Sequence, residues 1–208
     1  MSIPRLHVVV NDEAAAGAGF ERRALEMQER CGPALALHVR LREIPVRRQL
    51  ALAEGLEEGA VETGGWLVVN RRLDLALAVG ADAVQLGRGA LPIEAVRDVA
   101  GESLRVGASV HDVPTADLRR REGADYLLAG SVYETASHPG RTPAGLRLIE
   151  RLAPMPLPVI AIGGITPARV PDVLAAGATG VAVIRAVWSA DDPVAAAEEL
   201  CGALDARP

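Results

Sequence analysis

Short apolar runs alternate with longer stretches of mixed polarity along the whole chain. The run V-I-A-I, which opens Val159–Ile165, carries no polar residue, and strands of this kind are buried on both faces, as in a parallel sheet. Eight such runs are predicted strands: Leu6–Val10, Ala34–Val39, Trp66–Val69, Ala83–Leu86, Leu104–Ala108, Tyr126–Ala129, the run before Gly163, and Gly180–Ile184. The stretches between them are predicted helices: Glu13–Arg30, Ile44–Gly59, Arg71–Gly80, Pro92–Ala100, Pro114–Glu122, Gly145–Ala153, a helix that begins near Thr166, and Asp191–Leu204.

The joint that leads from a helix into a strand is repeated three times. The segments V-G-A-D-A-V-Q-L-G (Val79–Gly87), E-G-A-D-Y-L-L-A-G (Glu122–Gly130) and A-G-A-T-G-V-A-V-I (Ala176–Ile184) each place Gly-Ala-Asp/Thr before an apolar strand. Glycine adopts the left-handed conformation at a helix C-terminus without steric cost. Repeated units of this kind favour a closed barrel or a doubly wound sheet. Eight of them without a linker predict the α/β class, as a (β/α)₈ TIM barrel that forms a single compact domain over residues 1–208.

The composition excludes several classes of protein. The net charge is −5 and no block of basic residues is present, so nucleic acid is not an expected partner. No apolar run reaches the roughly 18 residues of a membrane span, and the N-terminus lacks the apolar core of a signal peptide, so we expect a cytoplasmic protein without a membrane partner. All 22 basic residues are arginine, which excludes any mechanism that needs a Schiff-base lysine.

Two adjacent strand-to-helix turns near the C-terminus predict a phosphate site. Gly163 and Gly164 end one strand, and Thr166 with Pro167 then suits the start of a helix. The next strand leads into Ile184 and Arg185. Backbone N–H groups at such turns bind phosphate after strands 7 and 8 of many (β/α)₈ barrels. The alternative is that both are only tight turns between buried strands.

Polar side chains follow the other predicted strands, at the end of the barrel where the active sites of this fold lie. Arginine is frequent among them although the whole chain is acidic, which indicates a cationic mouth for a small phosphorylated or carboxylated substrate. The alternative is that these arginines cap helices or pair with acidic residues on the rim. If the strand continues, His38 and Arg40 share one side of it, and an anionic substrate would supply the partner that both need when buried. The candidate substrate-binding residues of this group are Arg40, Arg42, Asn70, Ser109 and His111.

The segment Ser131–Pro143 is too long for an ordinary connection between a strand and a helix. Thr135 and Ser137 can donate hydrogen bonds to phosphate oxygens, and His138 can transfer a proton near neutral pH. Its glycine and two prolines indicate a shaped loop such as a lid. The alternative is a solvated surface loop.

Taken together, these segments resemble the thiamine phosphate synthase/TenI family of small (β/α)₈ barrels, and the resemblance covers nearly the whole chain. The joint order of the motifs is specific to this family, and it implies a role in thiamin (vitamin B1) biosynthesis with a small phosphorylated substrate. The matching motifs are H-V-R-L-R (His38–Arg42), V-N-R-R-L-D-L-A-L-A-V-G-A-D-A-V-Q-L-G (Val69–Gly87), G-A-S-V-H (Gly107–His111), G-S-V-Y-E-T-A-S-H (Gly130–His138), V-I-A-I-G-G-I (Val159–Ile165) and G-V-A-V-I-R-A (Gly180–Ala186).

The synthase branch of this family joins a pyrimidine diphosphate to a thiazole phosphate and uses magnesium. In this chain Arg71 stands where the family has a metal-binding aspartate, and Gly89 or Ala90 stands in place of a second acidic ligand. His138 occupies the position of the family's diphosphate-binding lysine. Because magnesium needs carboxylate oxygens, these differences argue against the synthase reaction. That reaction is kept as an alternative, with magnesium as its cofactor.

The TenI branch lacks those acids too, and its known activity is a metal-free thiazole tautomerase reaction, a 1,3-proton shift on a carboxy-thiazole phosphate. The resemblance implies that Arg40 holds the carboxylate of this substrate. It also implies that the phosphate is held by Gly163, Gly164, Ile184 and Arg185. We therefore expect a tautomerase that needs no cofactor and no metal.

One position departs from the TenI pattern. Ser131 occupies the place of that branch's acid/base histidine, and serine is not a general base at neutral pH. We expect His138, or else His38, to carry the proton instead. The remaining alternative is a barrel that binds a phosphorylated ligand without catalysis. A homo-oligomer is possible for the enzyme and for the binding protein alike.

Overall fold

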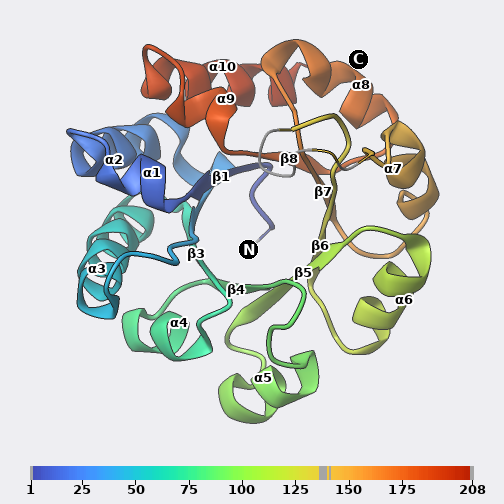
Figure 1. Cartoon of the computed structure of the whole chain (residues 1–208), viewed down its shortest axis with the longest axis horizontal. Coiled ribbons are helices and arrows are strands. Elements are labelled where there is room, and N and C mark those ends of the chain that lie inside the picture. The colour runs from blue at the N-terminus through green and yellow to red at the C-terminus, as the bar shows by residue number, and fades with distance from the viewer. Residues whose placement is uncertain (1, 136–139, 141, 207–208) are drawn as a thin grey trace.

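The computed structural model describes residues 2–135, 140 and 142–206, and it is a closed parallel barrel surrounded by helices (Figure 1). The strands follow one another around the barrel in chain order, and β8 pairs with β1 to close it. Each strand lies within two residues of its predicted bounds, so the predicted (β/α)₈ barrel is confirmed. The strands are β1 Leu6–Val10, β2 Leu35–Val39, β3 Trp66–Asn70, β4 Ala83–Leu86, β5 Arg105–Val110, β6 Tyr126–Gly130, β7 Val159–Ile162 and β8 Gly180–Val183.

Helices cover the outside of the barrel (Figure 1). The first helix differs most from the prediction, because the expected Glu13–Arg30 is divided into two helices by a turn that contains Gly17 and Gly19. No helix in the described part of the chain combines the length and apolar character needed to cross a bilayer. The α-helices of the described residues are α1 Asp12–Ala16, α2 Phe20–Cys31, α3 Val46–Thr63, α4 Leu73–Val79, α5 Ile93–Ala100, α6 Val113–Arg121, α7 Leu146–Leu152, α8 Val170–Ala175, α9 Arg185–Trp188 and α10 Pro193–Asp205, with short 3₁₀ helices η1 Gly32–Ala34 and η2 Pro167–Arg169.

The three repeated joints have the predicted left-handed glycine and a second role that the pattern did not show. Their glycines all have a positive φ, at Gly80, Gly123 and Gly177. The third residue of each joint accepts a hydrogen bond from an N–H near the start of the preceding strand: Asp82 from Leu67 at 2.9 Å, Asp125 from Val106 at 2.7 Å, and Thr179 from Val159 at 3.2 Å. Each joint therefore ties two neighbouring strands together at the end of the barrel opposite the strands' carboxyl ends.

The main apolar core lies between the barrel and its helices, while the barrel interior holds a smaller apolar cluster and several polar side chains. His7, His38 and Gln85 are buried there. The Tyr126 ring fits inside because β5 carries Gly107 opposite it, where any Cβ would collide with Tyr126 and Gln85. This polar interior lies directly beneath the carboxyl ends of the strands and forms the floor of the candidate site.

Candidate functional site

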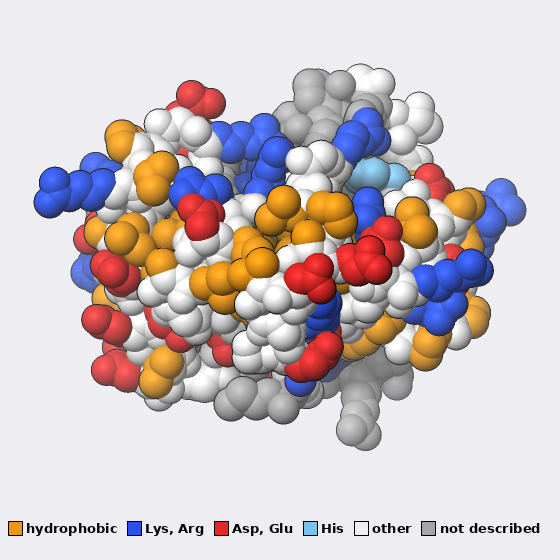
Figure 2. All heavy atoms as spheres, turned by 90° about the horizontal axis from the view of Figure 1, so that it is seen from below, with side chains coloured by type: hydrophobic (Ala, Val, Ile, Leu, Met, Phe, Trp, Pro, Cys, Tyr) orange, Lys and Arg blue, Asp and Glu red, His pale blue; other side chains and the backbone are white. Residues whose placement is uncertain are grey.

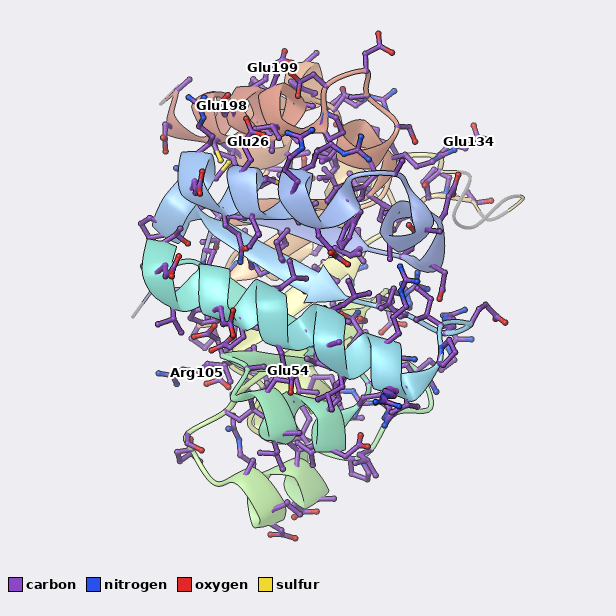
Figure 3. All side chains as sticks on the ribbon, turned by 90° about the vertical axis from the view of Figure 1, so that its left-hand side faces the viewer. Glu26, Glu54, Arg105, Glu134, Glu198 and Glu199 are labelled. Atoms are coloured by element: carbon purple, nitrogen blue, oxygen red, sulfur yellow. The ribbon has the colours of Figure 1, made fainter. Side chains whose placement is uncertain are left out.

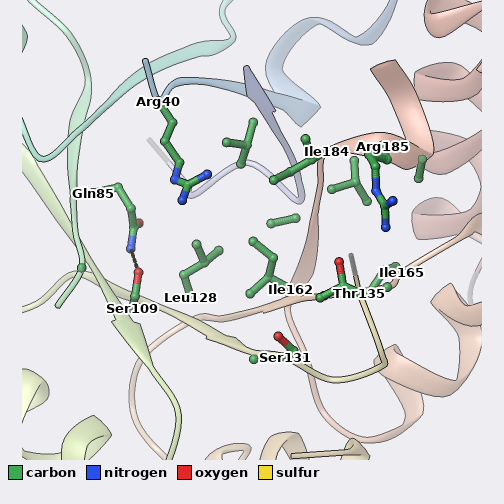
Figure 4. Close-up of a pocket in the computed structure, with 18 of the residues that line it drawn as sticks. Arg40, Gln85, Ser109, Leu128, Ser131, Thr135, Ile162, Ile165, Ile184 and Arg185 are labelled. Carbon is green, nitrogen blue, oxygen red and sulfur yellow. Dashed lines mark hydrogen bonds between the residues drawn. The ribbon is translucent and has the colours of Figure 1, made fainter. Parts of the chain in front are cut away.

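A cavity of about 720 Å³ opens at the carboxyl ends of the strands (Figure 4). The structure brings most of the predicted site residues together around this one cavity, although their contacts with a ligand stay predictions. Ser137 and His138 lie outside the described residues. The predicted residues in the lining are Arg40, Arg42, Asn70, Ser109, His111, Ser131, Thr135, Gly163, Gly164, Ile184 and Arg185.

The cavity has two chemically different sides. Figure 4 shows Arg40 entering from one side, near Gln85 and Ser109, whereas Ile184 and Arg185 lie on the opposite side. We call the first the arginine side, which carries Arg40, Arg71 and Arg88 after β2, β3 and β4. We call the second the glycine side, which carries Gly163, Gly164, Ile184 and Arg185 after β7 and β8.

Gly163 and Gly164 cannot be replaced by larger residues without a clash inside the protein, whether or not a ligand is bound. Gly163 has a φ of 106°, and a Cβ there would lie 2.7 Å from Ser131 Cβ. A Cβ at Gly164 would meet the Glu134 carbonyl oxygen and lie 2.8 Å from Tyr133 Cβ. The two glycines therefore let the segment after β6 lie directly against the turn after β7. The sequence indicated a phosphate turn, or only a tight turn, at these glycines and did not predict this contact.

Backbone N–H groups are available on the glycine side. Among the described residues, no hydrogen bond uses the N–H of Gly163, Gly164 or Ile184. Arg185 is the first residue of α9, so its N–H has no partner within the helix. Unpaired N–H groups that surround one space are suited to the oxygens of a phosphate.

Arg169 holds the glycine side together, and sequence reasoning missed it. Its Nη1 donates to the Gly164 carbonyl oxygen at 2.5 Å, and its guanidinium lies 4.4 Å from the centre of the Tyr133 ring. Arg169 also lines the cavity, so one side chain links the turn after β7 to the segment after β6 and faces the ligand space. Its position five residues after Gly164, in a helix start beside the predicted phosphate turn, was the signal available in the sequence.

Six arginines and no aspartate or glutamate line the cavity within the described residues: Arg40, Arg42, Arg71, Arg88, Arg169 and Arg185. None of these six forms an ion pair in the described part of the chain, whereas arginines elsewhere do, such as Arg97 with Asp125 at 2.7 Å. Pairing with rim acids therefore does not account for the arginines of the cavity.

The acidic side chains lie elsewhere on the molecule. Figure 2 shows acidic and arginine side chains mixed over the outer face of the helices. Figure 3 shows Glu26, Glu54, Glu198 and Glu199 on helices α2, α3 and α10, outside the barrel. The excess of positive charge is thus a local property of the cavity in a chain whose net charge is −5.

The arginines also repel one another. Burial lowers the pKa of Arg40, the charges of Arg42 and Arg71 lower it further, and Asp12 opposes this shift. Arginine keeps its proton in proteins, so the lowered pKa corresponds to an unfavourable energy of the charged side chain. A bound anion would remove that energy. Arg71 adds strain, because its φ of 69° is rare for a residue with a side chain.

The residues present do not fit a magnesium ion. Arg71 lines the cavity where the family resemblance expects an aspartate, and no carboxylate lines it within the described residues. No group of three potential metal-binding side chains occurs in the described part of the chain. Magnesium prefers carboxylate oxygens, and six guanidinium groups repel it.

His38 does not lie where it can reach a ligand, which corrects its predicted role in proton transfer to the substrate. Its side chain is fully buried inside the barrel, because inward-facing residues of β2 point along the interior below the cavity. Its Nε2 lies 2.7 Å from His7 Nδ1, and its Nδ1 lies 3.2 Å from Asn70 Oδ1. Burial lowers the pKa of His38 well below its ordinary value. Asn70, not His38, is the member of this group that lines the cavity.

His111 is the histidine that lines the cavity in the described part of the chain. Its Nδ1 lies 2.5 Å from the Gly130 carbonyl oxygen, which can only accept a hydrogen bond. Nδ1 therefore carries a proton, and in the neutral form of the ring Nε2 is an acceptor. Beside it, Gln85 donates from Nε2 to Ser109 Oγ at 3.1 Å, which positions both side chains at the floor of the cavity (Figure 4).

Comparison with known proteins identifies the family. The family model described as thiamine monophosphate synthase matches residues 6–187. The thiamine-phosphate synthase of Roseiflexus castenholzii is 40% identical over 93% of this chain and 85% of its own length, and that of Methanoculleus marisnigri is 40% identical over 92% of each chain. The bifunctional protein ThiM/ThiE of Symbiobacterium thermophilum is 45% identical, and this chain spans 35% of its length.

A solved structure agrees with these relatives. The thiamine phosphate pyrophosphorylase of Pyrococcus furiosus superimposes with a TM-score of 0.85 at 33% sequence identity. The superposition covers 97% of this chain and 95% of that structure's chain. The names of these proteins favour the synthase expectation over the tautomerase expectation. The chain belongs to the thiamine monophosphate synthase family.

Proposed function

We propose that this chain catalyses the synthase reaction of thiamine biosynthesis, in which a pyrimidine diphosphate and a thiazole phosphate give thiamine phosphate and pyrophosphate. The observation that carries this proposal is the set of six arginines without acidic partners in one cavity. The two synthase substrates together bring about four to five negative charges, whereas a carboxy-thiazole phosphate brings about three. The larger charge matches the lining better, and the names of the relatives support the same reaction.

The glycine side is suited to the thiazole phosphate. Its N–H groups at Gly163, Gly164 and Ile184 have no described partner, and the Arg185 and Arg169 side chains line the same space. Main-chain donors bind phosphate oxygens with a fixed geometry, and nearby guanidinium groups add charge-assisted hydrogen bonds. This arrangement would fix the thiazole ring at one end of the cavity.

The arginine side is suited to the diphosphate. When the new bond forms, the thiazole nitrogen donates its electron pair to the methylene carbon of the pyrimidine. The carbon–oxygen bond breaks at the same time, and its electron pair leaves with the diphosphate. Donors that face the departing oxygens stabilise this developing charge. In this chain the guanidinium groups of Arg40, Arg71 and Arg88 would provide that stabilisation without a metal ion.

The test is release of pyrophosphate from the two purified substrates, measured with magnesium and with excess EDTA. We expect product in both conditions, because guanidinium groups replace the metal. Arg88→Ala should raise KM for the pyrimidine diphosphate about tenfold or more, since charge-assisted hydrogen bonds contribute about 1.5–3 kcal/mol. The control is Arg22→Ala, which removes an exposed arginine of α2 and should leave KM unchanged. Absence of pyrophosphate in both conditions would refute the proposal.

The second candidate is the thiazole tautomerase reaction, which is favoured by the lack of acidic residues in the lining. Within the described residues His111 offers a free Nε2 for proton transfer, and His138 stays the predicted carrier outside them. Incorporation of deuterium from D₂O into a carboxy-thiazole phosphate, lost in His111→Gln or in His138→Ala, would support this reaction. A cytoplasmic location and a homo-oligomer stay predictions.

A further inference from the structure

The turn between β2 and α3 carries two of the arginines that line the cavity. It comprises residues 40–45, which belong to neither a strand nor a helix. Arg40 and Arg42 both line the cavity, and Figure 4 shows Arg40 entering it. A turn outside regular secondary structure has no ladder of backbone hydrogen bonds to fix its path. Other contacts must therefore determine where these two side chains lie.

One carboxylate binds three consecutive N–H groups of this turn. Asp12 Oδ1 accepts a hydrogen bond from the N–H of Glu43 at 2.9 Å and from that of Ile44 at 3.2 Å. The N–H of Arg42 lies 3.0 Å from Oδ1 and 3.1 Å from Oδ2 of the same carboxylate. Within the described residues no carbonyl oxygen accepts from these three N–H groups. Successive N–H groups that converge on one point form a nest for an anion, and here a carboxylate of the chain occupies it.

The Asp12 carboxylate has no part in capping its own helix. Asp12 is the first residue of α1, and Asn11 caps this helix by accepting from the Ala14 N–H at 3.1 Å. Burial alone would raise the pKa of Asp12, but the N–H groups of the turn outweigh burial and lower this pKa below its ordinary value. The carboxylate is thus charged at neutral pH, and a charged acceptor forms a stronger hydrogen bond than a neutral one.

The two ends of the turn are also fixed. The N–H of Arg40 donates to the Val10 carbonyl oxygen at 2.9 Å. At the other end, the buried side chain of Gln49 donates from Nε2 to the Ile44 carbonyl oxygen at 2.6 Å. The Asp12 carboxylate holds the middle of the turn between these two points, so the whole backbone path beside the cavity is determined.

Charge alone does not account for an aspartate at this place. Asp12 forms no ion pair with an arginine in the described part of the chain. A negative charge close to the cavity also repels a phosphorylated ligand, so its direct electrostatic effect on binding is unfavourable. The contacts of this carboxylate are with backbone N–H groups, which indicates that it acts on the position of the turn.

We propose that Asp12 is a positioning residue: its carboxylate holds the turn after β2 in the path that places Arg40 and Arg42 at the cavity. A ligand then finds these guanidinium groups in place and does not have to order them when it binds. That the ligand here is a diphosphate rests on the proposed function, whereas the hydrogen bonds to the turn do not.

Two substitutions of Asp12 separate position from charge, with calorimetry of pyrophosphate binding as the measurement. Asp12→Ala removes the acceptor, and we expect pyrophosphate affinity to fall about tenfold, the effect of about one charge-assisted hydrogen bond. Asp12→Asn keeps an oxygen at Oδ1, which receives all three N–H groups, and removes the negative charge. This variant should bind at least as tightly as the unchanged chain. Unchanged or tighter binding in Asp12→Ala would overturn the proposal, as would Asp12→Asn binding as weakly as Asp12→Ala.

The matched control is Asp192→Ala, which removes a carboxylate that accepts two N–H groups at the start of α10 and does not line the cavity. We expect it to lower stability without changing pyrophosphate affinity. An affinity loss equal to that of Asp12→Ala would show a merely structural effect. In the Arg40→Ala/Arg42→Ala background, Asp12→Ala should have no further effect on pyrophosphate binding, and a further tenfold loss there would contradict the proposed route.

Amide hydrogen exchange measured by NMR needs no ligand. The N–H groups of Arg42, Glu43 and Ile44 should exchange faster in Asp12→Ala and keep their protection in Asp12→Asn. Equal exchange in Asp12→Ala and the unchanged chain would overturn the proposal. Absence of synthase turnover together with the expected binding and exchange results would refute the proposed function and leave the role of Asp12 standing.

Discussion

Replacing Gly163 by alanine tests whether the turn after β7 is held in contact with the segment after β6. The new Cβ would lie 2.7 Å from Ser131 Cβ and 2.8 Å from Ser131 Cα, so backbone must move to admit it. Overpacking of this kind costs about 1–3 kcal/mol. The positive φ of 106° adds about 1–2 kcal/mol for any residue with a Cβ. We expect the free energy of unfolding to fall by about 2–5 kcal/mol.

The matched control is Gly80→Ala. Gly80 has a φ of 71°, but no heavy atom lies within 4 Å of its Cβ position, so only the conformational cost of about 1–2 kcal/mol applies. Urea unfolding measures both variants, and calorimetry with inorganic phosphate measures the effect on the glycine side. A Gly163→Ala loss no larger than that of Gly80→Ala would refute the close contact with Ser131. Unchanged phosphate affinity in Gly163→Ala would show that this turn does not bind phosphate.

Three further changes test other parts of the chain. Arg71→Gly removes the strain at φ 69°, so we expect urea unfolding to give a free energy of unfolding higher by about 0–1 kcal/mol. Calorimetry of the same variant should show weaker pyrophosphate binding. A clear loss of stability would contradict this reasoning. Burial, aided by the charge of Asp82, raises the pKa of Glu57 to about 7, so the folded state holds this proton more tightly than the unfolded state and stability falls as pH rises from about 4.5 to 7. In urea titrations at several pH values, Glu57→Gln should reduce this pH-dependent loss of stability by about 1–2 kcal/mol. That is about half of what the whole pKa shift would give, because the side chain is partly exposed. Arg169→Lys keeps the charge but loses the planar contact with Tyr133, so phosphate affinity should fall several-fold, and equal affinity would show that charge alone matters.

The barrel could be predicted closely because its strands are short continuous apolar runs bounded by turn residues, which are typical of strands buried on both faces. The first helix could not. Its polar and apolar positions continue without a visible break. The turn at Gly17 and Gly19 depends on separate packing, because α1 contacts β1 whereas α2 packs mainly against α3 and α10. Glycine in a helix lowers its stability, but tertiary packing decides whether the helix ends there.

The candidate site was predictable in position and only partly in geometry. Gly163 and Gly164 stand out in the sequence, yet their contact with Ser131 joins residues far apart in the chain and needs the fold. The role of Arg169 depends on the same contact. His38 was misassigned because the alternation of a strand predicts that it faces inward but not how deep in the barrel it lies. Depth depends on the stagger between strands, which no single segment encodes.

The aspartate and threonine that follow the repeated glycines have a consequence for how this chain can change. They tie β3 to β4, β5 to β6 and β7 to β8 at the end of the barrel opposite the cavity. A side chain at the mouth that takes no part in the close contact at Gly163 can then be exchanged while these hydrogen bonds stay in place. Arg71 can keep its strained φ and its repulsion with Arg40 at one end of β3 while Asp82 ties the other end of that strand.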